Sequence, residues 1–440
     1  MKKILLIQPS AYDQNHKPIK KKKLYFVGLA MPLLAAMMPE DWETEIIMEI
    51  LEDIPMDTDA DLIGISTMGH GVIRSIDIAK AFRDKGKTVI LGGYMASIMT
   101  EEAIKHCDAV VVGDAELVWK DMLADFEKGK LKKIYEKNLE EGEFSTPIPR
   151  FDLIMNKKIG DFLPVQAGRG CPNTCSFCSV ACLYKGRYIK KPLDEVIRDI
   201  KQVKGLGYKK FLLLDDNIFS DREYLHTLLK EIKKMDMEWM SQCDIRIGEE
   251  DEMLKTLADS GCTTLSFGLE SISRESLIGM NKGWADPLKY AQSIKNIQSF
   301  GIDVSTEMVV GGEGDTLESI RMTKNFIEDN KISVPRFYIL TPIPGTQYFK
   351  DMVAAGRLVK KDIYSFDGTE AVHIPMNMTT DELTNAYWEL YESLFTLKSI
   401  FKRNILRKEF LKRPWKYLFY CIVNLYYKYQ INQRITPNIF

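Results

Sequence analysis

The sequence predicts an α/β protein in which a doubly wound, Rossmann-like parallel sheet precedes a partial (β/α)6 barrel and a helical C-terminal region. Three observations support this fold class. Short apolar runs alternate with helical segments through residues 1–140, which is typical of a parallel sheet covered on both faces. About six β/α units of similar length follow in residues 161–365, and residues 366–440 are predicted to be mainly helical. Residues 141–160 mix charges with prolines and are predicted to form a linker.

Composition and charge limit the classes of protein to consider. An apolar content of 45% and a charged content of 28% are ordinary for a soluble globular protein. The net charge of −2 argues against a general nucleic-acid binder. No apolar run reaches 18 residues, so no spanning helix is expected, and residues 4–7 are too short for a signal peptide core. Three of the eight cysteines cluster, which favours a reducing cytoplasm.

The N-terminal domain, residues 1–140, is predicted to present a ligand-binding edge. Predicted strands cover residues 4–7, 44–48, 61–66, 88–91 and 109–112, and predicted helices cover residues 28–38 and 72–85. Ligands of doubly wound sheets bind at the carboxyl ends of the strands. The residues expected at that edge are Ser66, Thr67, Met68, Gly92, Gly93, Tyr94, Gly113 and Glu116. Glycine allows a large ligand to approach the backbone, but tight turns also require it, so both interpretations stay open.

The second domain, residues 161–365, carries polar residues where barrel chemistry is expected. Predicted strands cover residues 162–165, 210–215, 238–244, 263–269, 303–310 and 336–340. Predicted helices cover residues 192–203, 225–235, 251–260, 287–300 and 319–329. Parallel barrels place catalytic groups at the carboxyl ends of their strands. The candidates at or near these ends are Asp215, Asn217, Glu270, Gly311, Gly312 and Tyr338. The acids would equally suit helix N-caps, and the tyrosine would equally suit a packed core.

Three cysteines on one glycine-rich loop predict a metal centre. Cys171, Cys175 and Cys178 follow the spacing C-x3-C-x2-C. Cysteine ligation is the rule for iron–sulfur clusters, and three thiolates would leave one iron open to a further partner. The same thiols could instead hold zinc if Cys182 supplied a fourth ligand.

The segment from about residue 160 to 360 resembles the radical SAM superfamily. Its cluster motif matches the three cysteines, with the aromatic Phe177 before the last of them. The resemblance implies a [4Fe–4S] cluster that chelates S-adenosylmethionine (SAM) and cleaves it to a 5′-deoxyadenosyl radical. The cofactor-binding residues that it implies are Phe177, Glu270, Gly311 and Gly312. The residues that it suggests for the substrate side, and hence for catalysis, are Asp215, Asn217 and Tyr338.

Most of residues 1–130 resembles the N-terminal domain of the cobalamin-binding radical SAM family. The likeness lies in Asp61–Ser66, Val89–Gly93 and Ala109–Glu116. It implies that cobalamin is a further cofactor. Two departures stand out: the D-x-H-x-x-G signature, whose His ligates cobalt in many cobalamin proteins, is absent, and Met95 stands where relatives often have His. Any bound cobalt would therefore have no His ligand from that motif.

The resemblance leaves two functional classes open. The first is cobalamin-dependent methylation of an unactivated carbon in a natural-product, lipid or tetrapyrrole-like substrate. The second is radical SAM chemistry without cobalamin, such as C–C bond formation, cyclisation, dehydration or rearrangement. Both imply a small-molecule or lipid substrate and an electron donor such as flavodoxin or ferredoxin, and neither implies nucleic acid.

The C-terminal region permits two interpretations. A helix is expected over residues 380–400, and residues 398–440 hold ten Lys or Arg against one acid, Glu409. Aromatic residues lie among these charges in the run Trp415–Val423. Basic residues beside aromatics are typical of an interfacial helix on an anionic membrane, which predicts peripheral membrane contact. The alternative is a helix packed on the barrel with a solvated basic face.

Overall fold

The computed structural model describes residues 1–13, 15–137, 144–360, 366 and 368–437. The chain divides into two compact units. Of the described residues, the first unit contains those of 1–167 and 189–211, and the second contains those of 168–188 and 212–437. Among the described residues, no helix is long and apolar enough to cross a membrane.

The first unit contains a six-stranded sheet with the strand order β3-β1-β4-β5-β6-β7. Its strands are β1 (Lys2–Gln8), β3 (Trp42–Met48), β4 (Leu62–Ser66), β5 (Thr88–Gly92), β6 (Ala109–Val112) and β7 (Ile134–Glu136). Neighbouring strands pair in parallel throughout. The order reverses between β1 and β4, and such a switch point is where open parallel sheets bind ligands. The five predicted strands are present, and β7 is an additional edge strand.

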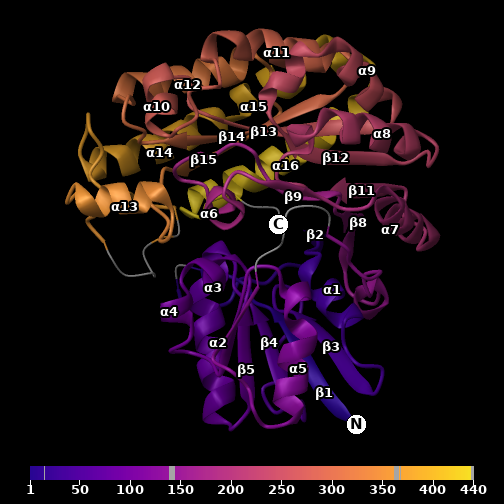
Figure 1. The fold of residues 1–440 in the computed structure, drawn as a ribbon. Coiled ribbons are helices and arrows are strands. Elements are labelled where there is room, and N and C mark those ends of the chain that lie inside the picture. The colour runs from indigo at the N-terminus through magenta and orange to yellow at the C-terminus, as the bar shows by residue number, and fades with distance from the viewer. Residues whose placement is uncertain (14, 138–143, 361–365, 367, 438–440) are drawn as a thin grey trace. The chain divides into compact units, whose positions relative to one another are not determined.

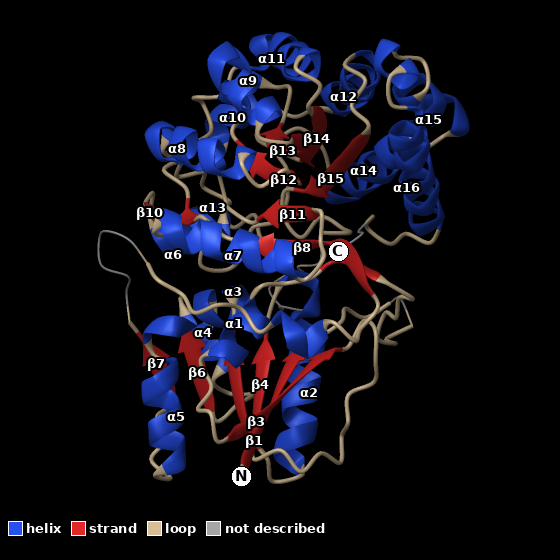
Figure 2. Ribbon diagram, turned by 90° about the vertical axis from the view of Figure 1, so that its right-hand side faces the viewer, coloured by secondary structure: helices blue, strands red, loops and turns tan. Residues whose placement is uncertain are grey.

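Helices cover both faces of this sheet. Helix α2 (Val72–Asp84) buries Ile78 and Phe82 in one apolar cluster with Leu5 and Ile63 of the strands. Helix α5 (Trp119–Glu127) packs on the opposite face, next to Gly64 of β4. The position that a Cβ atom on Gly64 would take lies 2.9 Å from the Leu6 side chain and 3.9 Å from the ring of Trp119. Figure 2 shows α2 and α5 on opposite sides of the strands. The sheet is therefore wound on both faces, with its core formed by alternating strand residues.

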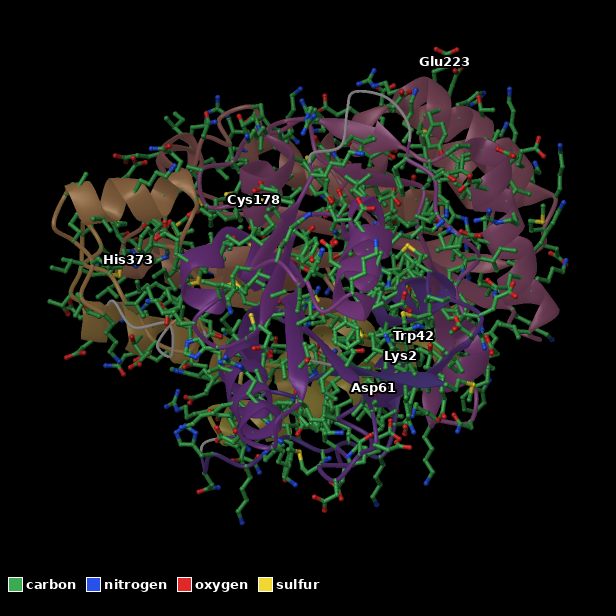
Figure 3. The ribbon with its side chains drawn as sticks, turned by 60° about the horizontal axis from the view of Figure 1, so that its bottom comes forward. Lys2, Trp42, Asp61, Cys178, Glu223 and His373 are labelled. Atoms are coloured by element: carbon green, nitrogen blue, oxygen red, sulfur yellow. The ribbon has the colours of Figure 1, made fainter. Side chains whose placement is uncertain are left out.

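The amino ends of the central strands are held together by polar and aromatic contacts. Lys2 is paired with Trp42 across β1 and β3, and its Nζ atom lies 5.5 Å from the Trp42 ring centroid. Asp61 accepts a hydrogen bond from the backbone N–H of Lys3 at 2.8 Å. Figure 3 shows Lys2, Trp42 and Asp61 gathered at this end. These contacts fix the register of the sheet at the edge opposite to its predicted ligand site.

A second, seven-stranded sheet forms the barrel wall, in the order β15-β14-β13-β12-β11-β8-β2. Its six successive β/α strands are β8 (Ile159–Val165), β11 (Lys210–Leu213), β12 (Glu238–Cys243), β13 (Cys262–Glu270), β14 (Asp303–Val310) and β15 (Val334–Ile339). The intervening helices are α7 (Leu193–Gly205), α8 (Arg222–Lys233), α9 (Asp251–Asp259), α10 (Arg274–Gly279), α11 (Pro287–Ser299) and α12 (Leu317–Asp329). In Figure 1, α8, α9, α11 and α12 lie along one side of these strands. The prediction of a partial, six-unit barrel is confirmed.

The seventh strand of this sheet comes from the N-terminal part of the sequence. Strand β2 (Leu24–Phe26) pairs in parallel with β8, and the rings of Phe26 and Phe162 lie 5.6 Å apart. The sequence pattern did not predict this strand because three residues are too few to show a period.

The predicted linker is more buried than its composition suggests. Phe151 and Ile154 lie in a short 3-10 turn and are fully buried. Residues 141–143 lie outside the described residues, and β8 begins at Ile159 rather than at residue 161. The domain limits expected from sequence, with linker 141–160 between the N-terminal domain and the barrel, stay a prediction.

The C-terminal region forms three helices, and the prediction of one continuous helix over 380–400 is wrong. Helix α14 (Thr380–Leu394) ends before α15 (Leu397–Asn404), because Thr396 interrupts the helix and caps α15 through its hydroxyl. Helix α16 (Pro414–Asn432) follows. The buried guanidinium of Arg403 joins them to the barrel by donating to the carbonyls of Ile332 and Ser333 and to Asn424 Oδ1, each at 2.9 Å.

Candidate functional site

The three clustered cysteines lie on one loop between β9 (Gly168–Gly170) and α6 (Ser179–Tyr184). Cys171, Cys175 and Cys178 are all free thiols. The N–H of Cys178 donates to the carbonyl of Cys175 at 3.2 Å, which closes the loop into a turn before the helix. Cys175 is buried and the other two cysteines are half-buried. The half-buried Phe177 lies inside this turn, as the motif predicts.

Backbone contacts from remote segments fix the loop. The N–H of Ser176 donates to the carbonyl of Met280 at 3.0 Å, and the carbonyl of Ser176 accepts from the N–H of Tyr348 at 2.8 Å. The side-chain amide of Asn281 donates to the carbonyl of Thr174 at 2.7 Å. The loop is therefore held in place by segments that lie more than 100 residues away in the chain.

The end of β11 supports the strand that leads into the loop. Asp216 accepts from the N–H of Gly170 at 2.7 Å, and Asp215, which is buried, accepts from the hydroxyl of Tyr188 at 2.9 Å. The Tyr188 ring lies against Gly168, so closely that a Cβ atom there would come within 2.2 Å of the hydroxyl oxygen. Asp215, a predicted catalytic residue, thus contacts Tyr188, whose ring packs against the strand that leads into the cysteine loop.

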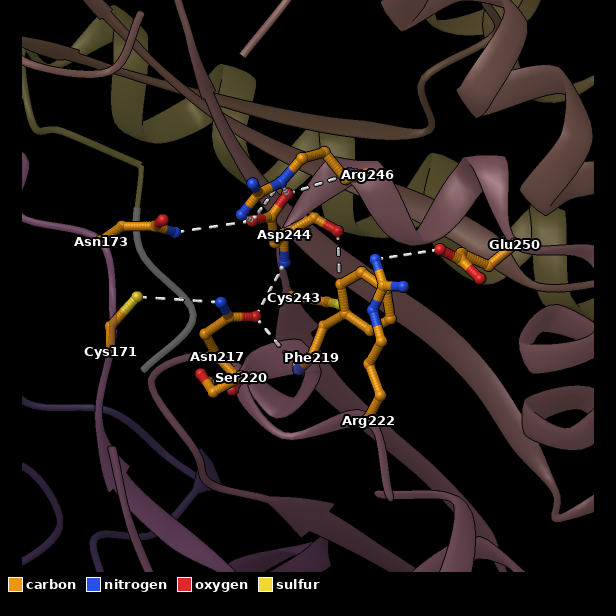
Figure 4. Close-up of polar contacts among 10 residues, drawn as sticks. All are labelled: Cys171, Asn173, Asn217, Phe219, Ser220, Arg222, Cys243, Asp244, Arg246 and Glu250. Atoms are coloured by element: carbon orange, nitrogen blue, oxygen red, sulfur yellow. Dashed lines mark hydrogen bonds and ion pairs between the residues drawn. The ribbon is translucent and has the colours of Figure 1, made fainter. Parts of the chain in front are cut away.

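Asn217 connects the cysteine loop to two barrel strands, as Figure 4 shows. Its Nδ2 atom donates to the Sγ atom of Cys171 at 3.7 Å. Its Oδ1 atom accepts from the N–H groups of Phe219 and Asp244, both at 3.1 Å. With both ends of the amide engaged, the N–H···S contact has a fixed direction, and hydrogen bonds to sulfur ligands tune an iron–sulfur centre.

Asp244, at the end of β12, is a site residue that the sequence reasoning did not select. It forms an ion pair with Arg246 and accepts from Asn173 at 3.5 Å (Figure 4). The Arg246 guanidinium in turn lies 4.3 Å from the ring centroid of Trp284. Asp244 could have been identified from the sequence because it directly follows a strand. Trp284 follows no strand, so no sequence signal marks it.

Glu270 lies at the end of β13 in a buried ion pair with Lys282, at 2.8 Å. Its φ angle of +61° lies in the left-handed region, beside an irregularity in the pairing of β13 with β14. Burial alone would lower the pKa of Lys282, but the charge and hydrogen bond of Glu270, together with Cys175 and Asp244, outweigh it and leave that pKa raised. Lys282 lies in a loop without a sequence signal and was missed.

Burial raises the pKa of all three loop thiols, that of Cys175 to about 12. Lys282 opposes this shift at Cys175, whereas the neighbouring thiols reinforce it. A thiol with such a pKa is protonated at neutral pH, so a bound cation would have to displace its proton.

The arrangement of the side chains weighs against a single zinc ion. Among the residues that the structure describes, no three His, Cys, Asp or Glu side chains converge in a way that could hold one metal ion. Cys182, the suggested fourth zinc ligand, instead directs its thiol to the carbonyl of Gly345 at 3.3 Å. An iron–sulfur cluster, which binds each thiolate at a separate iron, fits three neighbouring but separate thiols better.

The glycine loop after β14 is organised by a buried carboxylate. Asp315 accepts from the N–H groups of Gly311 and Gly312, at 2.9 and 3.0 Å, and from the hydroxyl of Ser276 at 2.7 Å. Burial raises the pKa of Asp315. These two backbone N–H groups already have an acceptor. A Cβ atom would lie 2.5 Å from Leu383 on Gly311 and 2.8 Å from Ser276 on Gly312, so packing within the protein accounts for both glycines. Asp315 was not among the predicted site residues.

Tyr338, the third predicted catalytic residue, lies on β15 and not at its end. Burial raises its pKa, and the nearby positive charge of Arg336 opposes the shift. Arg336 is ion-paired with Glu307, which stands opposite it on β14. Tyr338 thus lies near a half-buried charged pair of the barrel wall.

The predicted ligand edge of the first unit contains both structural and open positions. Thr67 is buried, donates to the carbonyl of Gly92 at 2.8 Å and accepts from the N–H of Ala96 at 2.9 Å. Gly93 has a φ of +94°, and a Cβ atom there would lie 2.8 Å from the carbonyl oxygen of Thr67. The hydrogen bonds of Thr67 and the close packing of Gly93 explain why these residues occur here without a bound ligand.

Other positions on this edge leave room for a ligand. Met68 is 59% exposed. No heavy atom of the described residues lies within 4 Å of the position that a Cβ atom on Gly113 would take. The remaining predicted residues of this edge are half-buried: Ser66, Gly92, Tyr94 and Glu116. The edge therefore offers exposed backbone after β6 and an exposed thioether after β4.

Comparison with known proteins agrees with this geometry. Residues 165–327 match the model of the Radical SAM superfamily. The chain is 28% identical over 412 residues to the bacteriochlorophyllide d C-12(1)-methyltransferase of Chlorobaculum tepidum, which covers 91% of this chain and 89% of that protein. It is 29% identical over 412 residues to the bacteriochlorophyllide d C-8(2)-methyltransferase of the same organism, with 89% of each chain covered.

A solved structure shares the fold. The cobalamin-dependent S-adenosylmethionine radical enzyme OxsB, with aqua-cobalamin and S-adenosylmethionine bound, superposes with a TM-score of 0.67 at 12% identity. The likeness covers 98% of this chain and 73% of that chain.

Proposed function

We propose that this chain, which belongs to the radical SAM superfamily, is a cobalamin-dependent methyltransferase acting on an unactivated carbon of a tetrapyrrole-like substrate. The observation that carries the proposal is the whole-length likeness to two methyltransferases named for bacteriochlorophyllide d. Both matches extend well beyond the radical SAM segment, so they include the N-terminal sheet.

The cysteine loop fits a [4Fe–4S] cluster held by Cys171, Cys175 and Cys178. When bound, the cluster and SAM supply the one-electron cleavage that yields a 5′-deoxyadenosyl radical. The chain itself orients the loop through Asn217, which directs an N–H group at the Cys171 sulfur. Asp215 acts through Tyr188 and is assigned a positioning role.

Three further groups are assigned to the remaining ligands. Glu270 is the acid at a strand end that would meet the polar groups of SAM, and Lys282 holds it in place. Phe177 would provide apolar contact with SAM, and Gly311 and Gly312 are assigned to SAM binding on the resemblance alone. Tyr338, near the half-buried charged pair of the barrel wall, is assigned to the substrate cavity.

Cobalamin fits the carboxyl edge of the first sheet, around Ser66–Met68, Gly92–Tyr94 and Gly113–Glu116. The exposed Met68 and the open space at Gly113 leave the backbone accessible to a large flat ligand. A low-potential donor such as flavodoxin or ferredoxin would supply the electron. The eight free thiols are in keeping with a reducing compartment such as the cytoplasm.

Methyl transfer can be tested with a labelled donor. The anaerobically reconstituted enzyme is incubated with SAM carrying a trideuterated methyl group, a reductant and a bacteriochlorophyllide d-type chlorin. Mass spectrometry should show a chlorin carrying one added labelled methyl group, and Cys175→Ala should abolish it. Formation of 5′-deoxyadenosine with a rearranged or cyclised, unmethylated chlorin would instead support radical chemistry without cobalamin.

A further inference from the structure

Helix α16 carries apolar side chains on two opposite faces. The face packed against the protein contains Tyr417, Val423, Asn424, Tyr427 and Ile431, which are buried. The other face contains Trp415, Leu418, Phe419, Ile422, Leu425, Tyr426 and Tyr429, each of which has another member three or four residues away along the helix. Trp415 is 82%, Ile422 63% and Tyr429 58% exposed. We call these seven residues the outer strip.

The outer strip is presented by a firmly held helix. Asp303, at the start of β14, accepts from the hydroxyls of Tyr417 and Tyr420 at 3.0 and 3.1 Å, and is ion-paired with Lys416. Farther along, the amide of Asn424 donates to the carbonyl of Ser333 at 3.0 Å. The exposure of the outer strip is therefore a property of the folded helix and not of a frayed end.

Positive charge accompanies the outer strip. Residues 398–440 contain ten Lys or Arg and a single acid. Several of these bases serve the fold, such as Arg403 and Lys416. Lys408, Lys412 and Arg413, which directly precede the exposed Trp415, are themselves exposed. Within the described part of the chain, none of these three has a carboxylate partner.

We propose that the outer strip of α16 docks the protein on an anionic lipid bilayer, with the helix axis in the plane of the interface. Large apolar contiguous patches are uncommon on monomeric soluble proteins and mark interaction surfaces. Tryptophan and tyrosine favour the headgroup region, and the adjacent bases are attracted to anionic headgroups. The same bases would repel each other in a contact between two copies of this face. The inner face of α16 is engaged by the barrel, so the helix lies on the membrane and does not insert across it.

Vesicle co-sedimentation of the full-length holoprotein tests this proposal. Vesicles of phosphatidylcholine with about one-third phosphatidylglycerol should bind the protein at low salt, and pure phosphatidylcholine should bind it weakly. The triple variant Trp415→Gln, Phe419→Gln, Ile422→Gln should lower the partition coefficient at least about ten-fold. The triple variant Lys408→Gln, Lys412→Gln, Arg413→Gln should weaken binding and reduce its dependence on salt.

Matched controls separate this face from general surface properties. Leu288, Met322 and Val353 are exposed apolar residues of the barrel helices, and their replacement by Gln should leave binding unchanged. Lys230, Lys255 and Lys295 are exposed lysines elsewhere, and their replacement by Gln changes the net charge equally. Absence of binding to anionic vesicles at low salt would overturn the proposal, as would equal losses in the control variants. So would self-association, measured by sedimentation velocity, that the apolar triple variant abolishes without vesicle binding.

Discussion

Asn217 illustrates how single side chains define the site. Its side-chain amide donates to the Cys171 sulfur and accepts from two backbone N–H groups, so it sets the position of this thiol relative to the ends of β11 and β12. Asp215 and Glu270, which the sequence singled out for chemistry, are engaged by Tyr188 and Lys282. At the scale of residues, the site therefore consists largely of groups that orient other groups.

Replacing the Asn217 amide by a carboxylate should change the redox behaviour of the cluster. Asn217→Asp keeps the acceptor for both N–H groups, removes the donor to Cys171 and adds a negative charge. The midpoint potential of the reconstituted cluster should become more negative by roughly tens of millivolts. A redox titration followed by electron paramagnetic resonance measures it. Asn173→Asp is the control, because it adds the same charge nearby without removing a bond to sulfur; equal potentials in the two variants would contradict the N–H···S contact.

Breaking the Glu270–Lys282 ion pair should lower the stability of the folded protein. Lys282→Met leaves a buried carboxylate without its partner and should lower the free energy of unfolding by about 3–5 kcal/mol. The double variant Lys282→Met, Glu270→Gln should recover most of that loss, because no unpaired charge stays buried. Urea unfolding of the cluster-free protein measures both. If the double variant is stable but does not bind SAM, Glu270 acts on the ligand and not only on the fold.

His373 should make stability depend on pH. It is fully buried, and burial lowers its pKa from 6.5 to about 4. Between these values the unfolded chain binds a proton that the folded chain does not, so stability is lost as the pH falls below about 6.5. From pH 7.5 to 5.5 the loss should be about 1.4 kcal/mol, and His373→Leu should flatten this slope. Urea midpoints at the two pH values measure it. His226→Gln, at an exposed histidine, is the control, and an unchanged slope in His373→Leu would contradict the assignment.

At the scale of elements, β9 and its partner β10 (Tyr188–Lys190) form a two-stranded sheet that sets the direction of the chain as it leads into the cysteine loop. Gly168 and Gly170 let the Tyr188 ring and the Arg187 carbonyl approach so closely that any side chain would collide with them. The three cysteines could be predicted as one site from their spacing alone, because they lie within eight residues of the sequence. The tethers that hold them were not, since Met280, Asn281 and Tyr348 come from segments whose approach depends on the folded barrel.

Adding one methyl group at Gly168 should disrupt this element. In Gly168→Ala the new Cβ atom would displace Tyr188 and break its hydrogen bond to Asp215. Iron bound per chain after reconstitution should fall at least roughly two-fold, because the loop loses its support. Tyr188→Phe keeps the ring and loses only the hydroxyl, so it should retain most of the iron. If Gly168→Ala binds as much iron as the wild type, β9 does not organise the loop.

The strands of the two large sheets other than β2 and β7, and the long helices α7, α8, α9, α11 and α12 of the barrel, were predictable to within a few residues. Some of the differences have clear physical reasons. Strands β2 and β7 have three residues each, too short for a periodic signal, and exist through pairing with distant strands. The break between α14 and α15 depends on Thr396, whose hydroxyl can equally face solvent inside a helix. Tertiary contacts decide such cases, and local sequence does not encode them.

At the scale of the whole molecule, the alternation of strands and helices was enough to predict a parallel sheet followed by a six-stranded partial barrel. The sequence did not predict that β2 would add a strand to the barrel wall. Nor did it predict that Asp315 would accept the hydrogen bonds of the N–H groups of Gly311 and Gly312. The substrate class rests on whole-length relatives, because no pattern in the sequence specifies a tetrapyrrole.

The central claim is that one chain holds both a [4Fe–4S] cluster and cobalamin. Anaerobic reconstitution with iron, sulfide and hydroxocobalamin, followed by gel filtration and metal analysis, tests it most directly. The account predicts about four iron atoms and about one corrin per chain, with the iron lost and the corrin retained in a variant lacking Cys171, Cys175 and Cys178. Full iron without any retained corrin would contradict the account and leave the barrel to perform radical chemistry without cobalamin.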